Sequence, residues 1–191
     1  EVYCCAILNS QPMGFYAPAQ LVGDARRHGV EVRPVDINGS TWDCSLEPDG
    51  RGALAVRLGF RMIKGFKEDD AQWLTAARGY ADMASIQRRA GLRKAASERL
   101  AMADAFASLG ISRRDALWYA KAVDDSEPMP LLDDPLLDEP LTRTALPVLS
   151  HAEDVFEDFI STRLSLKDHP VRLVRDHAGK NITPNANLRD I

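Results

Sequence analysis

The 191-residue sequence predicts a mainly α protein with a small β component. Glycines divide a long helical stretch, residues 60–121, into short pieces, and two strand-like segments flank a strong turn before it. Apolar residues make up 45% of the chain, which is enough for a packed core. We expect a short helix–strand unit and a hairpin, followed by a domain built from tandem helix–hairpin–helix motifs.

The first 40 residues predict two helices and a strand. Pro12 ends a helix over Val2–Leu8, because the residue before a proline is pushed out of the helical region. Pro18 suits the first turn of the next helix, and Gly29 is a natural left-handed residue at its end. The rough alternation of Val30–Val35 then indicates a short strand.

A β-hairpin is expected next. Thr41–Leu46 and Ala53–Leu58 read as strands, and the residues between them include Pro-Asp-Gly, which is typical of a turn.

The following segment fits the helix–hairpin–helix pattern. That pattern has apolar residues five and two before a glycine, one directly after it, and a small residue six after it. These five places are filled by Phe60, Ile63, Gly65, Phe66 and Ala71. Gly65 would let the backbone approach a phosphate, and the free N–H groups of the next helix would face the anion. Lys64 and Lys67 flank the turn and would add positive charge.

A second, weaker copy follows 26 residues later. Gly91 is its turn, Leu92 the apolar residue after it and Ser97 the small residue, whereas Arg89 stands where an apolar residue is expected. This copy is the more basic one, through Arg88, Arg93 and Lys94. Two such hairpins predict a unit that grips both strands of a DNA duplex across the minor groove; a purely structural glycine turn is the alternative for each.

Charge is distributed unevenly along the chain, although its net value is only −4. Residues 57–114 contain twelve Lys/Arg against six Asp/Glu, whereas residues 124–139 contain seven acids and no base. This pattern predicts a basic DNA-binding module followed by an acidic linker. Arg113 and Arg114 begin another helix after Gly110, and they could either contact phosphate or form a solvated face.

The sequence offers no catalytic or metal site. There is no D-x-D pair, no phosphate-binding Walker loop and no nucleophile elbow, and the four histidines lack ligand spacing. Asp36 has no partner carboxylate, and Glu153-Asp154 with Glu157-Asp158 are expected to form a solvated helix face. Three cysteines without C-x-x-C spacing argue against zinc and disulfides and favour a reducing cytoplasm. The longest apolar run, seven residues, is too short to span a membrane, which takes about 20.

Three stretches resemble the error-prone branch of the bacterial C-family DNA polymerases, the polymerase III alpha-subunit type. They are NSQPMGFYAPAQLVGDARRHGVEVRPVDINGS (9–40), LRKAASERLAMADAFASLGISRRDALWYA (92–120) and HAEDVFEDFISTRLSLKDHP (151–170). The resemblance implies a piece of a much longer polymerase that extends primers on damaged templates. It also implies that the catalytic aspartates, Mg²⁺ and deoxynucleoside triphosphates belong to other parts of that protein, so we expect this piece to be inactive alone.

The resemblance suggests four regions. Residues 1–58 would be the rear of the fingers, 59–122 the tandem helix–hairpin–helix domain, 123–149 an acidic, Pro-rich linker, and 150–191 a helical segment leading to an absent OB-fold domain. Primer–template duplex is the expected partner.

Two other functions stay open. One is an accessory helix–hairpin–helix domain of another repair enzyme. The other is a protein-interaction module that docks a sliding clamp or a mutagenesis-cassette protein through the linker leucines, Met129–Leu132 or the helix of 151–175.

Overall fold

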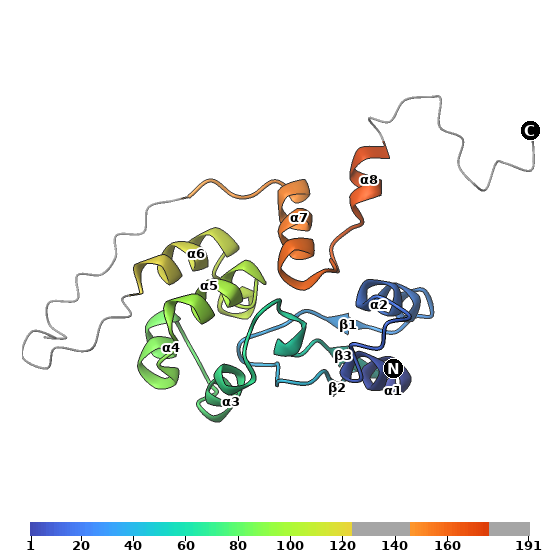
Figure 1. Cartoon of the computed structure of the whole chain (residues 1–191), viewed down its shortest axis with the longest axis horizontal. Helices are drawn as coiled ribbons and strands as arrows, with labels where there is room; N and C mark the ends of the chain where they lie inside the picture. Colours follow the sequence, from blue (N-terminus) through green and yellow to red (C-terminus); the bar gives the residue numbers. More distant parts are fainter. Residues whose placement is uncertain (124–145, 176–191) are drawn as a thin grey trace, which may run out of the picture.

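The computed structural model describes residues 1–123 and 146–175, and most of the expected linker lies outside them (Figure 1). The mainly α fold with a small sheet is confirmed. In chain order the described elements are α1 (Val2–Asn9), α2 (Pro18–Arg27), β1 (Val32–Arg33), β2 (Ser45–Pro48), β3 (Leu54–Arg57), the 3₁₀ turn η1 (Phe60–Met62), α3 (Glu68–Ala76), α4 (Met83–Ala90), α5 (Lys94–Met102), the 3₁₀ turn η2 (Ala107–Leu109), α6 (Arg113–Ala122), α7 (His151–Thr162) and α8 (Pro170–Arg175).

The small sheet has the strand order β1-β3-β2. The expected hairpin is present, because β2 and β3 are antiparallel with Ser45 opposite Arg57. Its first strand begins later than the expected Thr41, since residues 41–44 lie outside β2. β1 adds to the other side of β3 in parallel, with Val32 opposite Val56. This pairing joins residues 24 positions apart, and the local alternation that predicts strands does not indicate which strand becomes the neighbour.

Both N-terminal helices lie where the sequence predicts them. Pro18 occupies the first turn of α2, Arg26 and Arg27 its last, and Gly29 follows with a φ of +82°. Positive charge at that end complements the partial negative charge of the helix terminus. α1 buries Cys4, Cys5 and Leu8, and it contacts α2 and the strands β2 and β3.

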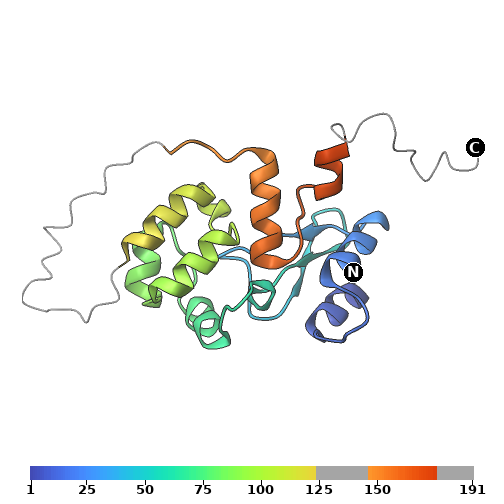
Figure 2. The same cartoon turned by 45° about the horizontal axis from the view of Figure 1, so that its top comes forward.

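One continuous cluster of buried side chains runs through the described chain, from Cys4 on α1 to Leu164 after α7. Its largest fully buried members include Leu8, Ile37, Phe60, Leu74, Leu100 and Phe106. Packing therefore continues across residue 58, where the sequence suggests a domain boundary. α7 stands between the helices of the hairpins and the sheet with α1 and α2 (Figure 2).

Candidate nucleic-acid interface

The second glycine turn, at residues 91–93, has a helix on each side. Asp82 caps the start of α4, and its side chain accepts a hydrogen bond from the Ser85 N–H at 2.6 Å. Gly91 caps the end of α4 and is left-handed, with φ +56° and ψ +36°. Leu92 is buried, and α5 starts directly afterwards with Arg93 as its N-cap. The helix α4, the left-handed glycine, the buried leucine and the helix α5 together make a complete helix–hairpin–helix.

The surroundings of Gly91 leave its backbone open. A Cβ built on this glycine would meet no atom within 4 Å, so a ligand can approach closely. The first turn of α5 contains no acidic residue, and Arg93 is exposed beside it. Free N–H groups and the helix dipole therefore act there together with a positive side chain, which favours an anion.

The first glycine turn is less regular than the sequence predicts. The residues before Gly65 form only the 3₁₀ turn η1, so this motif lacks a full first helix. The expected packing is otherwise present: Phe60 and Phe66 are buried with their ring centroids 5.7 Å apart, and Ala71 on α3 is fully buried. Gly65 itself is left-handed, with φ +73°.

Three features make the Gly65 turn less accessible to a phosphate. The first turn of α3 carries Glu68, Asp69 and Asp70, which would oppose a phosphate at that helix end. The Lys64 N–H donates to the Ser161 carbonyl of α7 at 2.8 Å, so it is already satisfied. The Arg99 side chain lies over the glycine, with Nε 3.3 Å from the place of a Cβ. Lys64 and Lys67 themselves are exposed, as expected for residues that would meet DNA.

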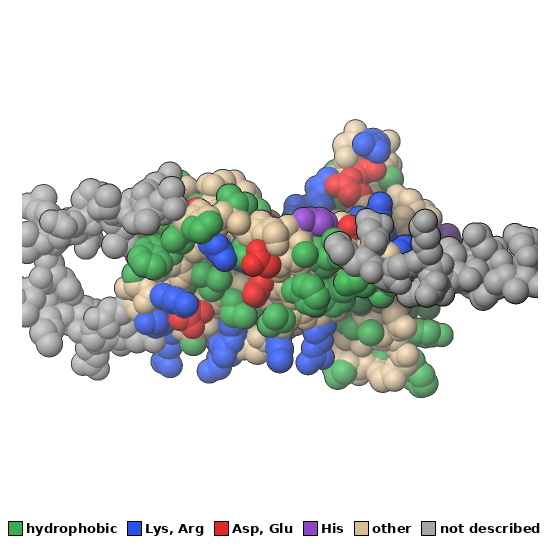
Figure 3. All heavy atoms as spheres, turned by 90° about the horizontal axis from the view of Figure 1, so that it is seen from above, with side chains coloured by type: hydrophobic (Ala, Val, Ile, Leu, Met, Phe, Trp, Pro, Cys, Tyr) green, Lys and Arg blue, Asp and Glu red, His purple; other side chains and the backbone are tan. Residues whose placement is uncertain are grey.

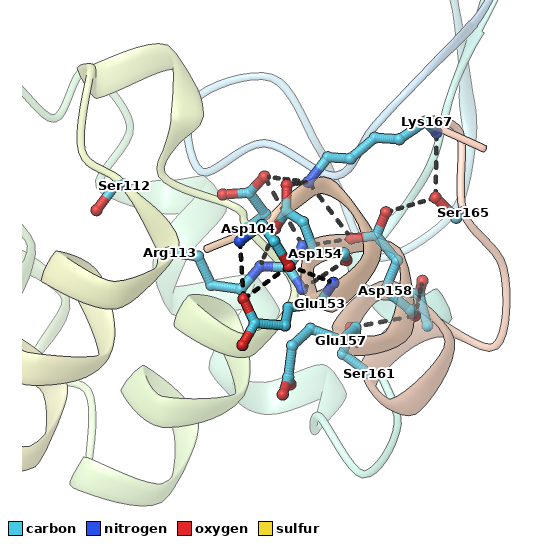
Figure 4. Close-up of polar contacts among 12 residues, drawn as sticks. Asp104, Ser112, Arg113, Glu153, Asp154, Glu157, Asp158, Ser161, Ser165 and Lys167 are labelled. Carbon is cyan, nitrogen blue, oxygen red and sulfur yellow. Dashed lines mark hydrogen bonds and ion pairs between the residues drawn. The ribbon is translucent and has the colours of Figure 1, made fainter. Parts of the chain in front are cut away.

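Arg113 is not a surface residue. Its side chain is only 2% exposed and forms an ion pair with Asp158, while Nε lies 3.3 Å from Asp154 Oδ1 and Nη2 lies 3.8 Å from Asp104 Oδ2 (Figure 4). The guanidinium thus faces carboxylates inside the protein, and we remove Arg113 from the candidate interface. Neighbouring Arg114 is partly exposed and donates to the Pro147 carbonyl at 2.7 Å.

The same cluster corrects the expectation for the acids of α7. Asp154 and Asp158 point inward, whereas Glu153 stays exposed. Lys167 completes the cluster, with Nζ 2.6 Å from Asp154 and 2.9 Å from Asp104. Burial opposes its charged form, but the hydrogen bonds to these two carboxylates outweigh that cost and raise the pKa of Lys167. Across residues 1–123 and 146–175, no group of three or more His, Cys, Asp or Glu is arranged to hold a metal ion.

The positive charge that can face DNA is smaller than the sequence count implies. Arg57 and Arg61 are held by Glu47 and Asp43, at 3.0 and 2.5 Å. Arg113 is internal, so a charge sum over residues 57–114 overstates the basic surface. Figure 3 still shows Lys and Arg side chains projecting in a row along one edge of the molecule.

The sequence does not indicate that Arg99 lies beside the Gly65 turn. Its spacing on α5 places it on the same face as buried Ala96, three residues earlier. Nothing local indicates that it reaches a glycine 34 positions away, because that contact depends on how α5 packs on the first turn.

The described helices include none that is both long enough and apolar enough to cross a membrane.

Comparison with known proteins agrees with this geometry. A family model described as a helix-hairpin-helix motif matches residues 29–116. The whole chain is 51% identical to an error-prone DNA polymerase of Ruegeria pomeroyi, of which it covers 18%. Ninety-four per cent of the chain is 47% identical to error-prone DNA polymerase 2 of Rhizobium meliloti, and 98% is 46% identical to an error-prone DNA polymerase of Mesorhizobium japonicum.

These matches cover the chain almost completely, whereas the chain spans less than a fifth of the length of the relatives reported first. Over almost its whole length the chain is therefore similar to one segment of proteins named error-prone DNA polymerase, and it carries a helix–hairpin–helix motif.

Proposed function

We propose that this segment binds duplex DNA without sequence preference, and that the second hairpin makes the main contact. The observation that carries the proposal is the open, left-handed Gly91 directly before α5, whose first turn has no acid and has exposed Arg93 beside it. Backbone N–H groups and a helix dipole recognise phosphate and carry no base readout. Lys94, the first residue of α5, belongs to the same contact.

The first hairpin takes a secondary part in this proposal. Its exposed Lys64 and Lys67 attract phosphates by charge, while the acids in the first turn of α3 weaken a direct backbone contact at Gly65. Arg114 is partly exposed at the start of α6 and adds charge at the periphery.

For the full-length protein we propose the activity that the relatives' names carry, error-prone DNA synthesis, in which this segment holds the primer–template duplex. Magnesium ions and deoxynucleoside triphosphates would act at aspartates outside this chain, and the segment alone would not extend a primer.

Fluorescence anisotropy of the 191-residue chain with a labelled primer–template duplex tests the DNA-binding proposal. Phosphate contacts release counterions, so affinity should fall steeply with salt, with a slope of log K against log salt of about −0.9 per phosphate. We expect Arg93→Ala/Lys94→Ala to weaken binding about tenfold at low salt, and Lys64→Ala/Lys67→Ala to weaken it only a few-fold, since each lost contact reduces the counterion release.

Arg172→Ala/Arg175→Ala on α8 is the matched control, because it removes the same two charges far along the chain from both hairpins. Its affinity should stay near that of the unaltered chain. Equal losses in all three double variants would mean that net charge alone drives binding, and absence of binding at low salt by the folded chain would end the proposal.

A protein-docking function has one observation in its favour. Phe156 and Ile160 on α7 are each 53% exposed, and Val171 and Val174 on α8 are exposed to 59% and 53%. Such apolar residues on neighbouring helices are typical of a contact surface. Sliding-clamp or mutagenesis-protein docking would be favoured if Phe156→Ser/Ile160→Ser abolished capture of the purified partner and left DNA affinity unchanged. Met129–Leu132 and the linker leucines lie outside the described residues.

A further inference from the structure

We propose that Asn38 is a positioning residue that fixes the distance between the two DNA-contacting hairpins; this rests on the proposed DNA binding. Asn38 lies in the loop of residues 36–40, between β1 and β2 and outside both hairpins. The loop contacts the tandem hairpin unit where the chain enters it, where it passes from one hairpin to the other and where it leaves.

The loop is held rigid by its own side chains. Asp36 Oδ1 accepts hydrogen bonds from the N–H groups of Asn38 at 2.9 Å and Gly39 at 2.8 Å. Ser40 Oγ accepts from the Asp36 N–H at 2.9 Å. Asp36 and Ser40 are buried, so these bonds are shielded from water and fix the direction of the Asn38 side chain.

The Asn38 amide grips the connection between the hairpins. Its Nδ2 donates to the Tyr80 carbonyl at 2.9 Å, and its Oδ1 accepts from the N–H groups of Tyr80 at 2.9 Å and Gly79 at 3.3 Å. Residues 79 and 80 lie between α3, which follows the first glycine turn, and α4, which precedes the second. One side chain therefore binds the backbone link on which the spacing of the hairpins depends.

The same loop holds both ends of the unit. Ser40 Oγ donates to the Leu58 carbonyl at 2.6 Å, just before the first hairpin. The Ile37 N–H donates to the Ala105 carbonyl at 2.8 Å, just after α5 of the second hairpin. The loop is thus a common support for three points of the DNA-binding unit that lie up to 47 residues apart in sequence.

Two arginine side chains stabilise the connection at residues 79 and 80 through contacts within the protein. Arg89 donates to the carbonyls of Gly79 and Arg78, each at 3.0 Å, and its guanidinium lies 5.5 Å from the centre of the Tyr80 ring. Arg78 donates to the Ser40 carbonyl. These contacts explain why Arg89 replaces the apolar residue expected in the second motif: it stabilises the connection.

Phosphates along a duplex have a regular spacing, so two hairpins can contact them together only at a matching separation. A connection freed from Asn38 would let one hairpin bind without the other. The lost contacts would appear as a shallower salt dependence, since the slope counts the phosphates that are neutralised.

The test compares Asn38→Ala with Asn9→Ala. Asn9 is a matched control, because its amide also bridges distant backbone, donating to the Cys44 carbonyl at 2.9 Å and accepting from the Cys44 N–H at 2.8 Å. Both variants should lower the melting temperature. Only Asn38→Ala should reduce the magnitude of the salt slope, by about one to two, as expected for the loss of one or two phosphate contacts.

A second arm uses Arg93→Ala/Lys94→Ala as the background. If Asn38 acts through the spacing of the hairpins, its removal should weaken DNA binding severalfold in the unaltered chain and hardly at all when the second hairpin is already disabled. Equal effects in both backgrounds, or an unchanged slope in Asn38→Ala, would overturn the inference. Failure of the unaltered chain to bind duplex would instead refute the proposed function.

Discussion

The turns at Gly65 and Gly91 share a left-handed glycine followed by a buried apolar residue and a helix, but their surroundings differ. Around Gly91 there is open space, and α5 begins without acids. Around Gly65 lie the Arg99 side chain, a carbonyl from α7 and three acids of α3. The better match to the sequence pattern is therefore the turn with the less open backbone and the more acidic surroundings.

This difference shows that the pattern specifies how a helical hairpin packs. It does not specify whether the backbone of the turn is accessible to a ligand. The five positions of the pattern specify apolar contacts and one glycine. Whether the N–H groups beyond the glycine can reach a phosphate depends on charges in the next helical turn and on neighbouring elements, which the pattern leaves free.

The largest change in the difference between the two turns should come from releasing α7. This helix supplies the Ser161 carbonyl that accepts the hydrogen bond from the Lys64 N–H. Arg113→Ala would remove the most buried cation of the cluster and leave Asp154 and Asp158 with Lys167 alone, and breaking a buried ion pair costs up to about 3–5 kcal/mol. We expect a large loss of stability in chemical unfolding. Hydrogen exchange at the Lys64 amide should then rise more than exchange in α4, which α7 does not hold.

Arg114→Ala is the control for that variant. It changes the next residue of the same helix, which is partly exposed and has the Pro147 carbonyl as its hydrogen-bond partner. Its unfolding free energy should change by less than about 1 kcal/mol, as for most surface substitutions. A similar loss in both variants would show that α6 itself, and not the ion cluster, is the sensitive element.

The sequence predicted the elements well because helix ends and turns depend on local chemistry. Pro18, Gly29 and the Pro-Asp-Gly turn each act within a few residues, and both glycine turns lie where the spacing places them. Long-range pairing was not predictable in the same way. Arg113 meets α7 carboxylates more than 40 positions later, so it looks like an ordinary basic residue at a helix start until the fold is known.

The site was only partly predictable for the same reason. Exposed Lys64, Lys67 and Arg93 lie at the turns as expected, but the sequence pattern assigns no role to the acids in the first turn of α3, which suit the dipole of that helix. Their effect on a ligand follows from the same dipole: charges that stabilise the helix end also occupy the place of an anion.

A smaller effect should follow from making the first turn resemble the second. Asp69→Asn/Asp70→Asn removes two negative charges beside Gly65, and helix-end charges are worth about 0.3–1 kcal/mol each, so duplex affinity should rise about threefold or more at low salt. Anisotropy titrations measure this change. Asp24→Asn/Glu31→Gln, which neutralises two exposed acids near α2 and β1, should raise affinity less; an equal rise would point to net charge rather than to the turn.

The smallest expected effect is a change in the stability of α4 at acid pH. The N-cap of α4 is the titratable Asp82, whereas the N-cap of η1 in the first hairpin is Gly59. Hydrogen bonds from the backbone and hydroxyl of Ser85 lower the pKa of Asp82 below its ordinary value of 3.8. A carboxylate with a lowered folded pKa stabilises the folded state fully above its unfolded pKa, and this contribution is lost as pH falls through the folded value. Amide exchange in α4 should therefore increase, relative to α5, whose first turn contains no acid, as pH falls below about 3.8. Asp82→Asn keeps a capping oxygen and removes the titration, so its α4 exchange should no longer depend on pH relative to α5; if that dependence persisted, the stabilising group would lie elsewhere in the hairpin.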